Sequence, residues 1–426
     1  MTDNKPESSH ANASMPPVML QEPRPNETTR HRPTSAPPKA RLQALTGLRI
    51  LAALAVYASH LGPPHGSPKL LSTLMESGYM GVTLFFTLSG FVLAINYFED
   101  FRHPAVRGMW QYIVARFARI YPLYILIVIY MIDRQHAFGE SIGVWWEHIL
   151  AIQAWDPNIH HAYSFDPPSW SVSVEFFLYA CFPLLVLALA RLRTLRATLT
   201  AAGFVTLAMA ALTTWFVVTG RGNLGWADPE SAHRWLYVTP LTRLGDFTLG
   251  ILAARLYAQT RGHVRLAQVG SVLTAVAGLV IVVLMAWPAN LYSAWSWDLA
   301  YALPAAVLIF GLAAAPLSLP ARVLSIPIVV LLGEASYAFY LVHMPALGFF
   351  GAGRWAVATS PTTILYEALT LGAILCLAVG LHVMVERPAR LYIRRLFGSY
   401  SGRVSNPAAI AEPDAAVATQ TQPPII

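Results

Sequence analysis

Ten long apolar segments limit the fold of this chain more than any other feature. A helix needs about 20 mostly apolar residues to cross a lipid bilayer. Segments of this kind lie near residues 44–62, 78–98, 119–136, 170–190, 198–219, 238–258, 267–287, 298–316, 328–351 and 364–385. They predict an all-α integral membrane protein, built as a bundle of about ten transmembrane helices.

The composition excludes a soluble protein of this size. Of the 426 residues, 55% are hydrophobic and 12% are charged, which leaves too much apolar surface for water. The net charge of +7 could suggest a nucleic-acid partner. The basic residues flank the apolar segments and form no single patch, so we predict a lipid bilayer and no nucleic acid. Cys181 and Cys376 lie inside apolar runs and indicate no disulfide framework.

The positions of Lys and Arg predict the orientation of the bundle, because these residues concentrate in cytoplasmic loops. With the N-terminus inside, the cytoplasmic side receives most of them, including the arginine groups at 191–196 and 387–395. The opposite side receives only Lys69, Arg134, Arg221, Arg234 and Arg354. We therefore expect both termini in the cytoplasm. Two stretches, 107–117 and 143–155, are too short to cross and are expected to be interfacial helices.

The composition divides the chain into three regions. Residues 1–41 are rich in Pro, Ser, Thr and Asn and are predicted to be a disordered cytoplasmic tail. Residues 42–397 form the ten-helix membrane domain. Residues 398–426 resemble the first region in composition and are predicted to be a second disordered tail, with no further folded domain.

Arg49 and His60 are ionisable residues within the first apolar segment, where such residues are costly and often functional. His60 lies eleven positions after Arg49, so a helix places them ~16 Å apart along its axis and within about 20° of one face. We expect Arg49 near the cytoplasmic end and His60 near the outer end of this helix.

More arginines are expected at the level of Arg49. Arg116 and Arg119 stand three residues apart on one helix face, at the inner end of the third segment. Anchoring by the positive-inside rule explains one such arginine, but three at one level favour an anion pocket. Ser89 and Gly90 lie in the inner half of the second segment. The glycine permits close approach of a slender ligand or, equally well, of another helix.

A second polar group is expected near the outer boundary. Trp170, Ser171 and Glu175 open the fourth segment at about the level of His60, and we expect Glu175 to be the partner of His60. The alternative is a glutamate that reaches the outer interface.

Two further helices carry polar residues. Ser336, Tyr340 and His343 share one face of the ninth segment, where they either line the acceptor site or hold helices together. Arg243 and Asp246 are expected to pair locally, and Glu386 is expected to be structural.

Several common catalytic motifs are absent from the sequence. There is no GxSxG, no glycine-rich phosphate loop and no HExxH, which gives no support for a serine hydrolase, a nucleotide-hydrolysing pump or a common zinc protease. His160 and His161 have no further ligands at a usual metal spacing. We therefore predict no metal.

These motifs together resemble the acyltransferase-3 family of multi-pass membrane acyltransferases. The family's arginine, ten residues and histidine correspond to Arg49 and His60, its SGxxL to Ser89, Gly90 and Leu93, its RxxR to Arg116 and Arg119, its WSxxxE-like stretch to Trp170, Ser171 and Glu175, and its late SYxxYLxH pattern to Ser336, Tyr340 and His343. The resemblance extends over about residues 42–396.

The resemblance implies an O-acyltransferase that moves an acetyl or other short acyl group from acyl-CoA to a hydroxyl of a carbohydrate-type acceptor. Arg49, Arg116 and Arg119 would bind the phosphates of the donor, whose arm would pass Ser89 and Gly90. His60 would be the general base, with Glu175 orienting it. Acyl-CoA is a substrate here, and no tightly bound cofactor is expected. The implied location is the inner membrane of a bacterium.

The acceptor is expected to meet Trp170, Ser171, Ser336, Tyr340, His343 and the outer loops at 156–170 and 226–235. O-antigen, exopolysaccharide, peptidoglycan, a lipid-linked glycan and a secondary metabolite such as a macrolide all fit, and the sequence names no protein partner. The alternatives are a proton-coupled transporter or flippase of a glycan or lipid, with His60 and Glu175 as its proton relay, and a non-catalytic membrane partner. The sequence shows no inverted repeat of the kind common in transporters.

Overall fold

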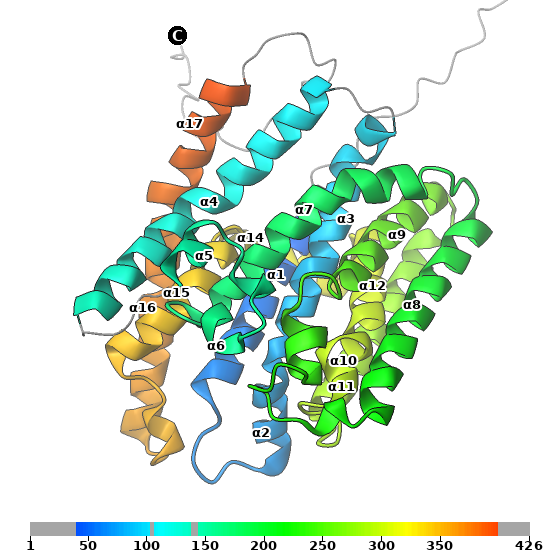
Figure 1. Ribbon diagram of the computed structural model, residues 1–426. Coiled ribbons are helices and arrows are strands. Elements are labelled where there is room, and N and C mark those ends of the chain that lie inside the picture. The colour runs from blue at the N-terminus through cyan, green and yellow to red at the C-terminus, as the bar shows by residue number, and fades with distance from the viewer. Residues whose placement is uncertain (1–39, 103–105, 138–143, 399–426) are drawn as a thin grey trace, which may run out of the picture. The chain divides into compact units, whose positions relative to one another are not determined.

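The computed structural model describes residues 40–102, 106–137 and 144–398, and every regular element in these ranges is a helix (Figure 1). The longer helices are α1 (Ala40–Leu61), α3 (Gly81–Phe101), α4 (Val106–Ala137), α7 (Trp170–Leu189), α8 (Leu195–Val218), α9 (Leu244–Thr260), α10 (Leu266–Ala286), α12 (Leu299–Ala314), α15 (Ser336–Phe350) and α16 (Pro361–Leu381). The shorter ones are α2 (Lys69–Glu76), α5 (Trp145–Ile149), α6 (Ile159–Ala162), α11 (Ala294–Trp297), α13 (Leu319–Leu324), α14 (Pro327–Glu334) and α17 (Arg387–Gly398), with short turns η1 (Ser77–Met80), η2 (Gln153–Trp155), η3 (Pro167–Ser169), η4 (Arg221–Asn223), η5 (His233–Val238), η6 (Arg354–Ala356) and η7 (His382–Glu386).

The predicted tails lie almost entirely outside the described residues. Helix α1 begins at Ala40, two residues inside the region predicted to be disordered, and α17 ends at Gly398. The remaining residues of 1–41 and 398–426 are not described, so disorder there stays a prediction.

The all-α class and the membrane character of the chain are confirmed. In the described ranges, eight helical stretches are long and apolar enough to cross a membrane, and a bent pair of helices makes a ninth if it counts as one span. The remaining predicted segment corresponds to α9, which has 17 residues. The count of ten spans and the cytoplasmic position of both termini stay predictions.

The ninth predicted segment is broken, so one continuous helix over residues 328–351 is wrong. Helices α14 and α15 meet at a bend of 65°. The bend lets α14 pack across the beginning of α1, where Gly333 lies directly against the carbonyl oxygen of Thr46. Helix α15 then packs along α1 and α16. The polar residues predicted to share one face, Ser336, Tyr340 and His343, still lie on one helix, because α15 begins at Ser336.

The two predicted interfacial helices are not seen as separate helices. Residues 107–117 belong to α4, which runs without interruption from Val106 to Ala137 through Pro122. Within 143–155 the structure has two short pieces, α5 and η2. Helix α5 ends because Ala151 adopts a positive φ of 54°, a left-handed conformation that helices do not continue through.

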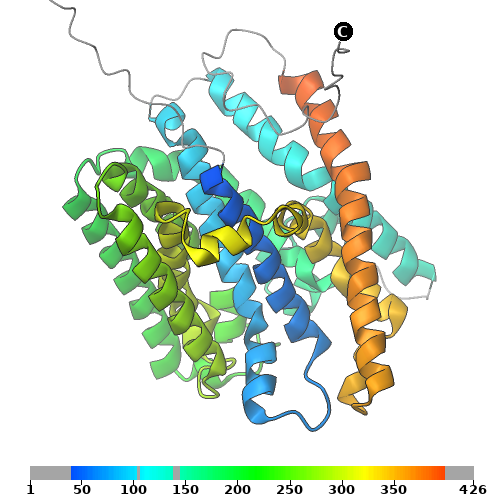
Figure 2. The same ribbon diagram turned by 180° about the vertical axis from the view of Figure 1, so that it is seen from behind.

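Helices α1 and α3 occupy the middle of the bundle. In Figures 1 and 2 they lie between one group made of α8, α9, α10 and α12 and another made of α4, α15, α16 and α17. Helix α3 packs most extensively against α9, and α10 packs against α12. Residues carried by α1 are therefore in reach of both groups.

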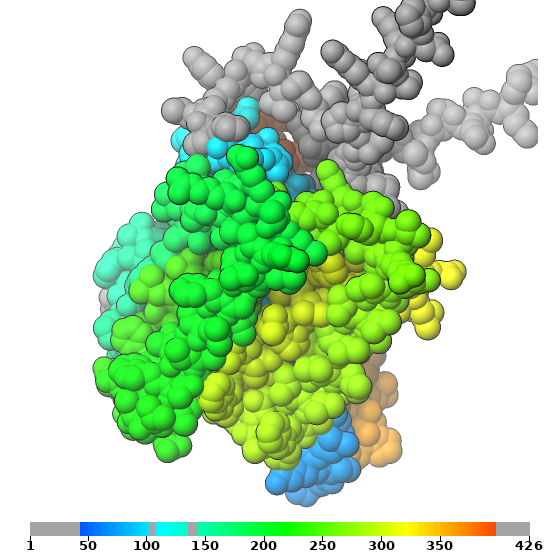
Figure 3. All heavy atoms as spheres, turned by 90° about the vertical axis from the view of Figure 1, so that its right-hand side faces the viewer, coloured from blue at the N-terminus to red at the C-terminus, as the bar shows by residue number. Residues whose placement is uncertain are grey.

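Helices α8 and α10 present apolar side chains outward. Phe204 and Leu207 of α8 and Val272 and Leu279 of α10 are each more than 60% exposed, and Figure 3 shows the face that these two helices cover. Surface of this kind is stable in contact with lipid tails and not with water. This face of the described bundle is therefore suited to the bilayer.

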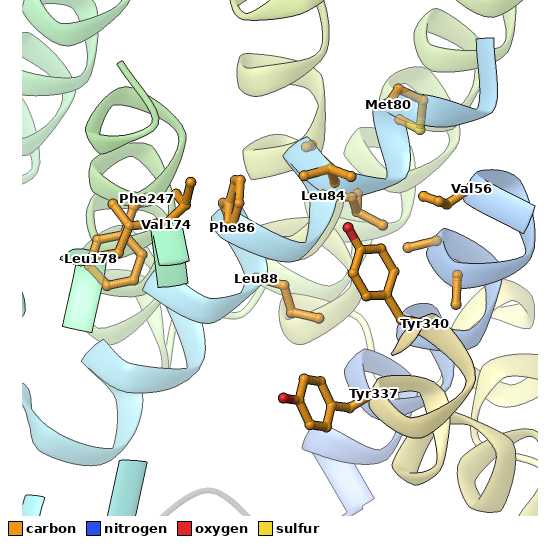
Figure 4. Close-up of a cluster of buried hydrophobic side chains, with 14 of the residues drawn as sticks. Val56, Met80, Leu84, Phe86, Leu88, Val174, Leu178, Phe247, Tyr337 and Tyr340 are labelled. Atoms are coloured by element: carbon orange, nitrogen blue, oxygen red, sulfur yellow. The ribbon is translucent and has the colours of Figure 1, made fainter. Parts of the chain in front are cut away.

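The interior joins α1, α3, α7, α9 and α15 through apolar side chains, with Val56 contributed by α1 (Figure 4). Figure 4 shows Leu84 and Leu88 of α3 between two groups, with Val174, Leu178 and Phe247 from α7 and α9 on one side and Tyr337 and Tyr340 from α15 on the other. The α3–α9 contact depends on two glycines. A methyl group on Gly90 would overlap the carbonyl oxygen of Phe247, and one on Gly250 would overlap that of Thr87. Of the two partners predicted for Gly90, the structure shows the helix.

We predict that Gly90→Ala lowers the thermal stability of the protein, although alanine is the better helix former by about 1 kcal/mol. The added methyl group meets backbone rather than a movable side chain, and overpacking of this kind costs about 1–3 kcal/mol. Gly278→Ala in α10 is the matched control, since nothing lies within 4 Å of the new methyl group. Thermal unfolding in detergent measures both variants. Equal or higher stability of the Gly90 variant would contradict the close contact.

Candidate active site

His60 and His343 are hydrogen-bonded to each other inside the bundle. His60 lies at the end of α1, and its Nδ1 is 3.1 Å from Nε2 of His343 on α15. Nδ1 of His343 is 2.6 Å from the carbonyl oxygen of Tyr340, one turn earlier. His343 is fully buried, whereas His60 is exposed to a cavity.

The hydrogen bonds fix the tautomers of both rings. A carbonyl oxygen only accepts, so Nδ1 of His343 donates to Tyr340. In a neutral ring, which full burial favours, Nε2 of His343 is then an acceptor. It therefore receives the proton on Nδ1 of His60, and Nε2 of His60 keeps its lone pair. This arrangement leaves one basic nitrogen at the cavity.

The cavity beside His60 has a volume of about 680 Å³, within the usual range for small-molecule sites. Its wall is mainly aromatic and includes Tyr79, Tyr163, Trp170, Trp226, Tyr237 and Trp297. The rings pack on one another; Tyr79 and Trp297, for example, have centroids 4.7 Å apart. A flat aromatic wall with a few polar groups can bind a ring-shaped ligand by stacking and orient it by hydrogen bonds.

A smaller cavity of about 260 Å³ meets His60 on another side. It is lined by aliphatic and glycine residues, among them Leu61, Met344, Leu347 and Gly348. His60 therefore lies between an aromatic compartment and an aliphatic one. Such a position allows one imidazole to contact two different ligands.

The arginines predicted near the inner end form a cluster with tyrosines and acidic residues. Arg116 donates to the hydroxyl of Tyr97 at 3.4 Å and lies over the ring of Tyr179 at 5.8 Å. Arg49 is in electrostatic range of Arg119. The three predicted arginines thus gather around one region, which could hold a polyanion.

Glu175 belongs to this inner cluster. Its Oε1 accepts a hydrogen bond from the hydroxyl of Tyr179, one turn along α7, and its charge acts on Arg49. Across the described residues, no hydrogen bond or ion pair joins Glu175 to His60, whose partner is His343. The Glu175 side chain is therefore directed to the arginine cluster and not to His60.

The other predicted site residues separate into those that line the large cavity and those that do not. Trp170 and Tyr340 line it. The hydroxyl of Ser171 donates to the carbonyl of Pro168, and Ser336 is buried with no hydrogen-bond partner. Ser89 is partly buried on α3, beside the glycine that contacts α9. Glu386 pairs with His382 at 3.0 Å, which fits the structural role expected of it.

Arg243 and Asp246 pair locally as predicted, at 2.8 Å, and both are fully buried. The Arg243 Nε also donates to the carbonyl of Tyr237, and its guanidinium lies over the Tyr237 ring at 4.7 Å. This pair therefore supports the aromatic wall of the large cavity from behind.

Sequence reasoning named the loops at 156–170 and 226–235 as acceptor contacts, and Tyr163 and Trp226 of these loops line the cavity. It missed Tyr79, Tyr237 and Trp297. The available signal was weak, since each is an aromatic residue near the end of an apolar segment, where aromatic residues are common in membrane proteins.

The sequence matches the acyltransferase-3 family, described as an acyltransferase domain, over residues 42–383. The chain therefore belongs to this family of acyltransferases. It is 32% identical over 391 residues to the acyltransferase MdmB of Streptomyces mycarofaciens, a match that covers 84% of this chain and 95% of that protein. It is 22% identical to the putative O-acetyltransferase SACOL0978 of Staphylococcus aureus (strain COL), over 72% of this chain and 51% of the relative. No solved structure matches.

We predict that the fold loses stability below pH 6.5 through His233, which stands in the cavity wall. Its Nδ1 lies 3.3 Å from the carbonyl of Trp226 and its Nε2 3.2 Å from the hydroxyl of Tyr163. Burial lowers the pKa of His233 to about 4, and the charges of Arg243 and Arg234 act in the same direction. The stabilisation by the neutral ring is complete above the unfolded pKa of about 6.5 and is lost as the pH falls toward 4.

The loss attributable to His233 amounts to about 2 kcal/mol at pH 5. Thermal unfolding at pH 7.5 and pH 5 measures it. His233→Gln should show a smaller decrease between the two values than the unmodified protein, because glutamine does not titrate. His263→Gln, which changes a histidine in the loop between α9 and α10, should keep the full decrease. An unchanged pH dependence in the His233 variant would contradict the prediction.

Proposed function

We propose that this protein is a membrane O-acyltransferase that moves an acetyl or other short acyl group from acyl-CoA to a hydroxyl of a carbohydrate-type acceptor. The observation that carries the proposal is the His60–His343 pair, which leaves a basic nitrogen between two compartments. Family membership supports the reaction class, and the name of the relative in Staphylococcus aureus supports O-acetylation. The proposed location is the inner membrane of a bacterium.

In this reaction Nε2 of His60 takes the proton of the acceptor hydroxyl as its oxygen attacks the thioester carbonyl. The carbon–sulfur bond breaks, the acyl group remains on the acceptor oxygen, and the proton on His60 passes to the departing CoA sulfur. His343 keeps His60 in the productive tautomer and accepts from it throughout. Glu175 is hydrogen-bonded to Tyr179 near the arginines, so in this proposal it belongs to the donor-binding region and is not the partner of His60.

The donor is proposed to enter from the end of the bundle that holds Arg49, Arg116 and Arg119. These residues would bind its phosphates through charge-assisted hydrogen bonds. The ~16 Å between Arg49 and His60 along α1 is comparable to the reach of the flexible arm that carries the thioester. The acyl group would then reach His60 only if the apolar side chains between α1, α3 and α15 moved aside.

The acceptor is proposed to occupy the aromatic cavity. A sugar ring stacks well on the tyrosine and tryptophan faces there, and its hydroxyl groups can reach His60. A volume of about 680 Å³ accommodates a few rings rather than a polymer. A glycan would therefore enter by one end, and a glycosylated small molecule such as a macrolide would enter whole.

We predict that His60→Ala reduces acyl transfer about 10²–10⁴-fold, the usual contribution of a general base. The assay supplies labelled acetyl-CoA and a panel of glycosides to the full-length protein in nanodiscs. A panel of neutral disaccharides and one glycosylated macrolide tests both acceptor classes. Thermal unfolding verifies that the variant is folded. Undiminished transfer by folded His60→Ala protein would exclude this residue as the base.

Two substitutions of His343 distinguish a role in setting the tautomer of His60 from a role in packing alone. His343→Gln keeps a hydrogen-bond acceptor for His60, whereas His343→Ala does not. We expect kcat to fall in the order unmodified protein, His343→Gln, His343→Ala, with little change in KM for either substrate. Equal kcat values for the two variants would argue for packing alone. His263→Gln serves as the control histidine.

We predict that Arg116→Gln and Arg119→Gln raise the Kd for acetyl-CoA by about 10–150-fold, because each removes a hydrogen bond to a charged group worth about 1.5–3 kcal/mol. If one of these arginines contacts the 3′-phosphate of CoA, the variant that lacks that arginine should bind acetyl-CoA without the 3′-phosphate almost as tightly as the unmodified protein binds the same shortened ligand. Arg221→Gln is the control, since Arg221 forms an exposed ion pair with Glu230 at the other end of the bundle. Unchanged donor affinity in both variants would contradict an arginine phosphate site.

A further inference from the structure

Three side chains with metal-ligand chemistry converge in the linker between α4 and α7, apart from the catalytic histidines. Glu147 of α5, Asp156 after η2 and His161 of α6 each offer one ligand atom, and these atoms all lie within 4.8 Å of one another. Nδ1 of His161 is 2.7 Å from Oδ2 of Asp156, and the carboxyl groups of Glu147 and Asp156 interact directly. Three short elements thus bring their ligands to one point.

Glu147 has an unsatisfied oxygen atom in this cluster. The residue is only 8% exposed, and its Oε2 is buried without a hydrogen-bond donor. The carboxyl group of Glu147 otherwise interacts with that of Asp156, so without a cation the two acidic groups share a proton, whereas a divalent cation would allow both to be ionised. Arg234 is close but donates to the backbone carbonyls of Ala154 and Asp156. No ion pair joins it to either carboxylate in the part of the chain that the structure describes.

We propose that Glu147, Asp156 and His161 bind one divalent transition-metal ion, for which Zn²⁺ is the best match. One imidazole nitrogen and two carboxylate oxygens are ligands that Zn²⁺ accepts readily, with water in the fourth position. Mg²⁺ and Ca²⁺ prefer oxygen ligands alone. Zn²⁺ lies about 2.0–2.2 Å from each of its tetrahedral ligands, so their ligand atoms lie about 3.3–3.6 Å apart. The His161–Asp156 pair at 2.7 Å would therefore open by at least about half an ångström, and the wider separations, all within 4.8 Å, would close.

The proposed ion is structural. His161 also accepts a hydrogen bond on its carbonyl oxygen from Nε2 of His148, at 3.0 Å, which holds α5 and α6 together. Directly after α6 comes Tyr163, which bonds to His233 and lines the aromatic cavity. The ion would therefore fix the linker that forms one wall of the cavity. It takes no part in acyl transfer, and this inference does not depend on the proposed function.

The test measures zinc in the full-length protein, purified in detergent with its affinity tag removed and treated with a chelator. After dialysis against Zn²⁺, elemental analysis should give about one zinc per chain, and added Zn²⁺ should raise the thermal unfolding temperature. His161→Ala, Asp156→Asn and Glu147→Gln should each weaken zinc binding about tenfold or more and remove the shift. Mg²⁺ at the same concentration should produce no shift.

His160→Ala is the matched control, because His160 is the adjacent histidine, is exposed and lies outside the cluster. It should bind zinc as the unmodified protein does. Three results would overturn the proposal. The unmodified protein could retain no zinc, or the His161 and His160 variants could retain equal amounts. Alternatively, Glu147→Gln could raise the unfolding temperature while Zn²⁺ leaves that of the unmodified protein unchanged. The last result means that the two carboxyl groups share a proton. No acyl-CoA is present, so the outcome is separate from that of the transfer assay.

Discussion

The hydrogen bond between His60 and His343 depends on how closely α1 is packed. Gly78 and Gly81 lie against carbonyl oxygens of Ala55 and Ala52 on α1, and Gly333 of α14 lies against that of Thr46. These contacts hold α1 between α3 and the bent pair α14 and α15. Larger residues would move α1 by more than a hydrogen bond tolerates. The site is thus a consequence of backbone packing that small residues permit.

The polar residues of the bundle form two groups at different depths on α1. The inner group contains Arg49, Arg116 and Glu175 with tyrosine partners, and the outer group contains His60 and the aromatic cavity. Apolar side chains such as Leu84 and Leu88 fill the interior of the bundle (Figure 4). In the proposed reaction, a charged donor head and a neutral acceptor would place different demands on their surroundings. Separate groups would meet both demands without exposing a charge to lipid.

Buried hydrogen bonds also support the wall of the aromatic cavity. Its wall includes His233, which is buried between the carbonyl oxygen of Trp226 and the hydroxyl of Tyr163 and is favoured in its neutral form by burial and by the nearby arginines. Arg234 and Arg243 anchor neighbouring backbone carbonyls. These buried hydrogen bonds hold the wall in one arrangement, which would lower the entropy lost when a ligand binds.

The sequence by itself determined the helical membrane class, the apolar segments and the family motifs, because hydrophobic length and residue spacing are local properties. It also determined that Arg49 and His60 share a face. Only the tertiary structure decided the partners: His343 for His60, Tyr179 for Glu175, and a helix against Gly90. It also decided that α15 bends away from α14. Such contacts join residues far apart in the chain, and their choice depends on how whole helices pack.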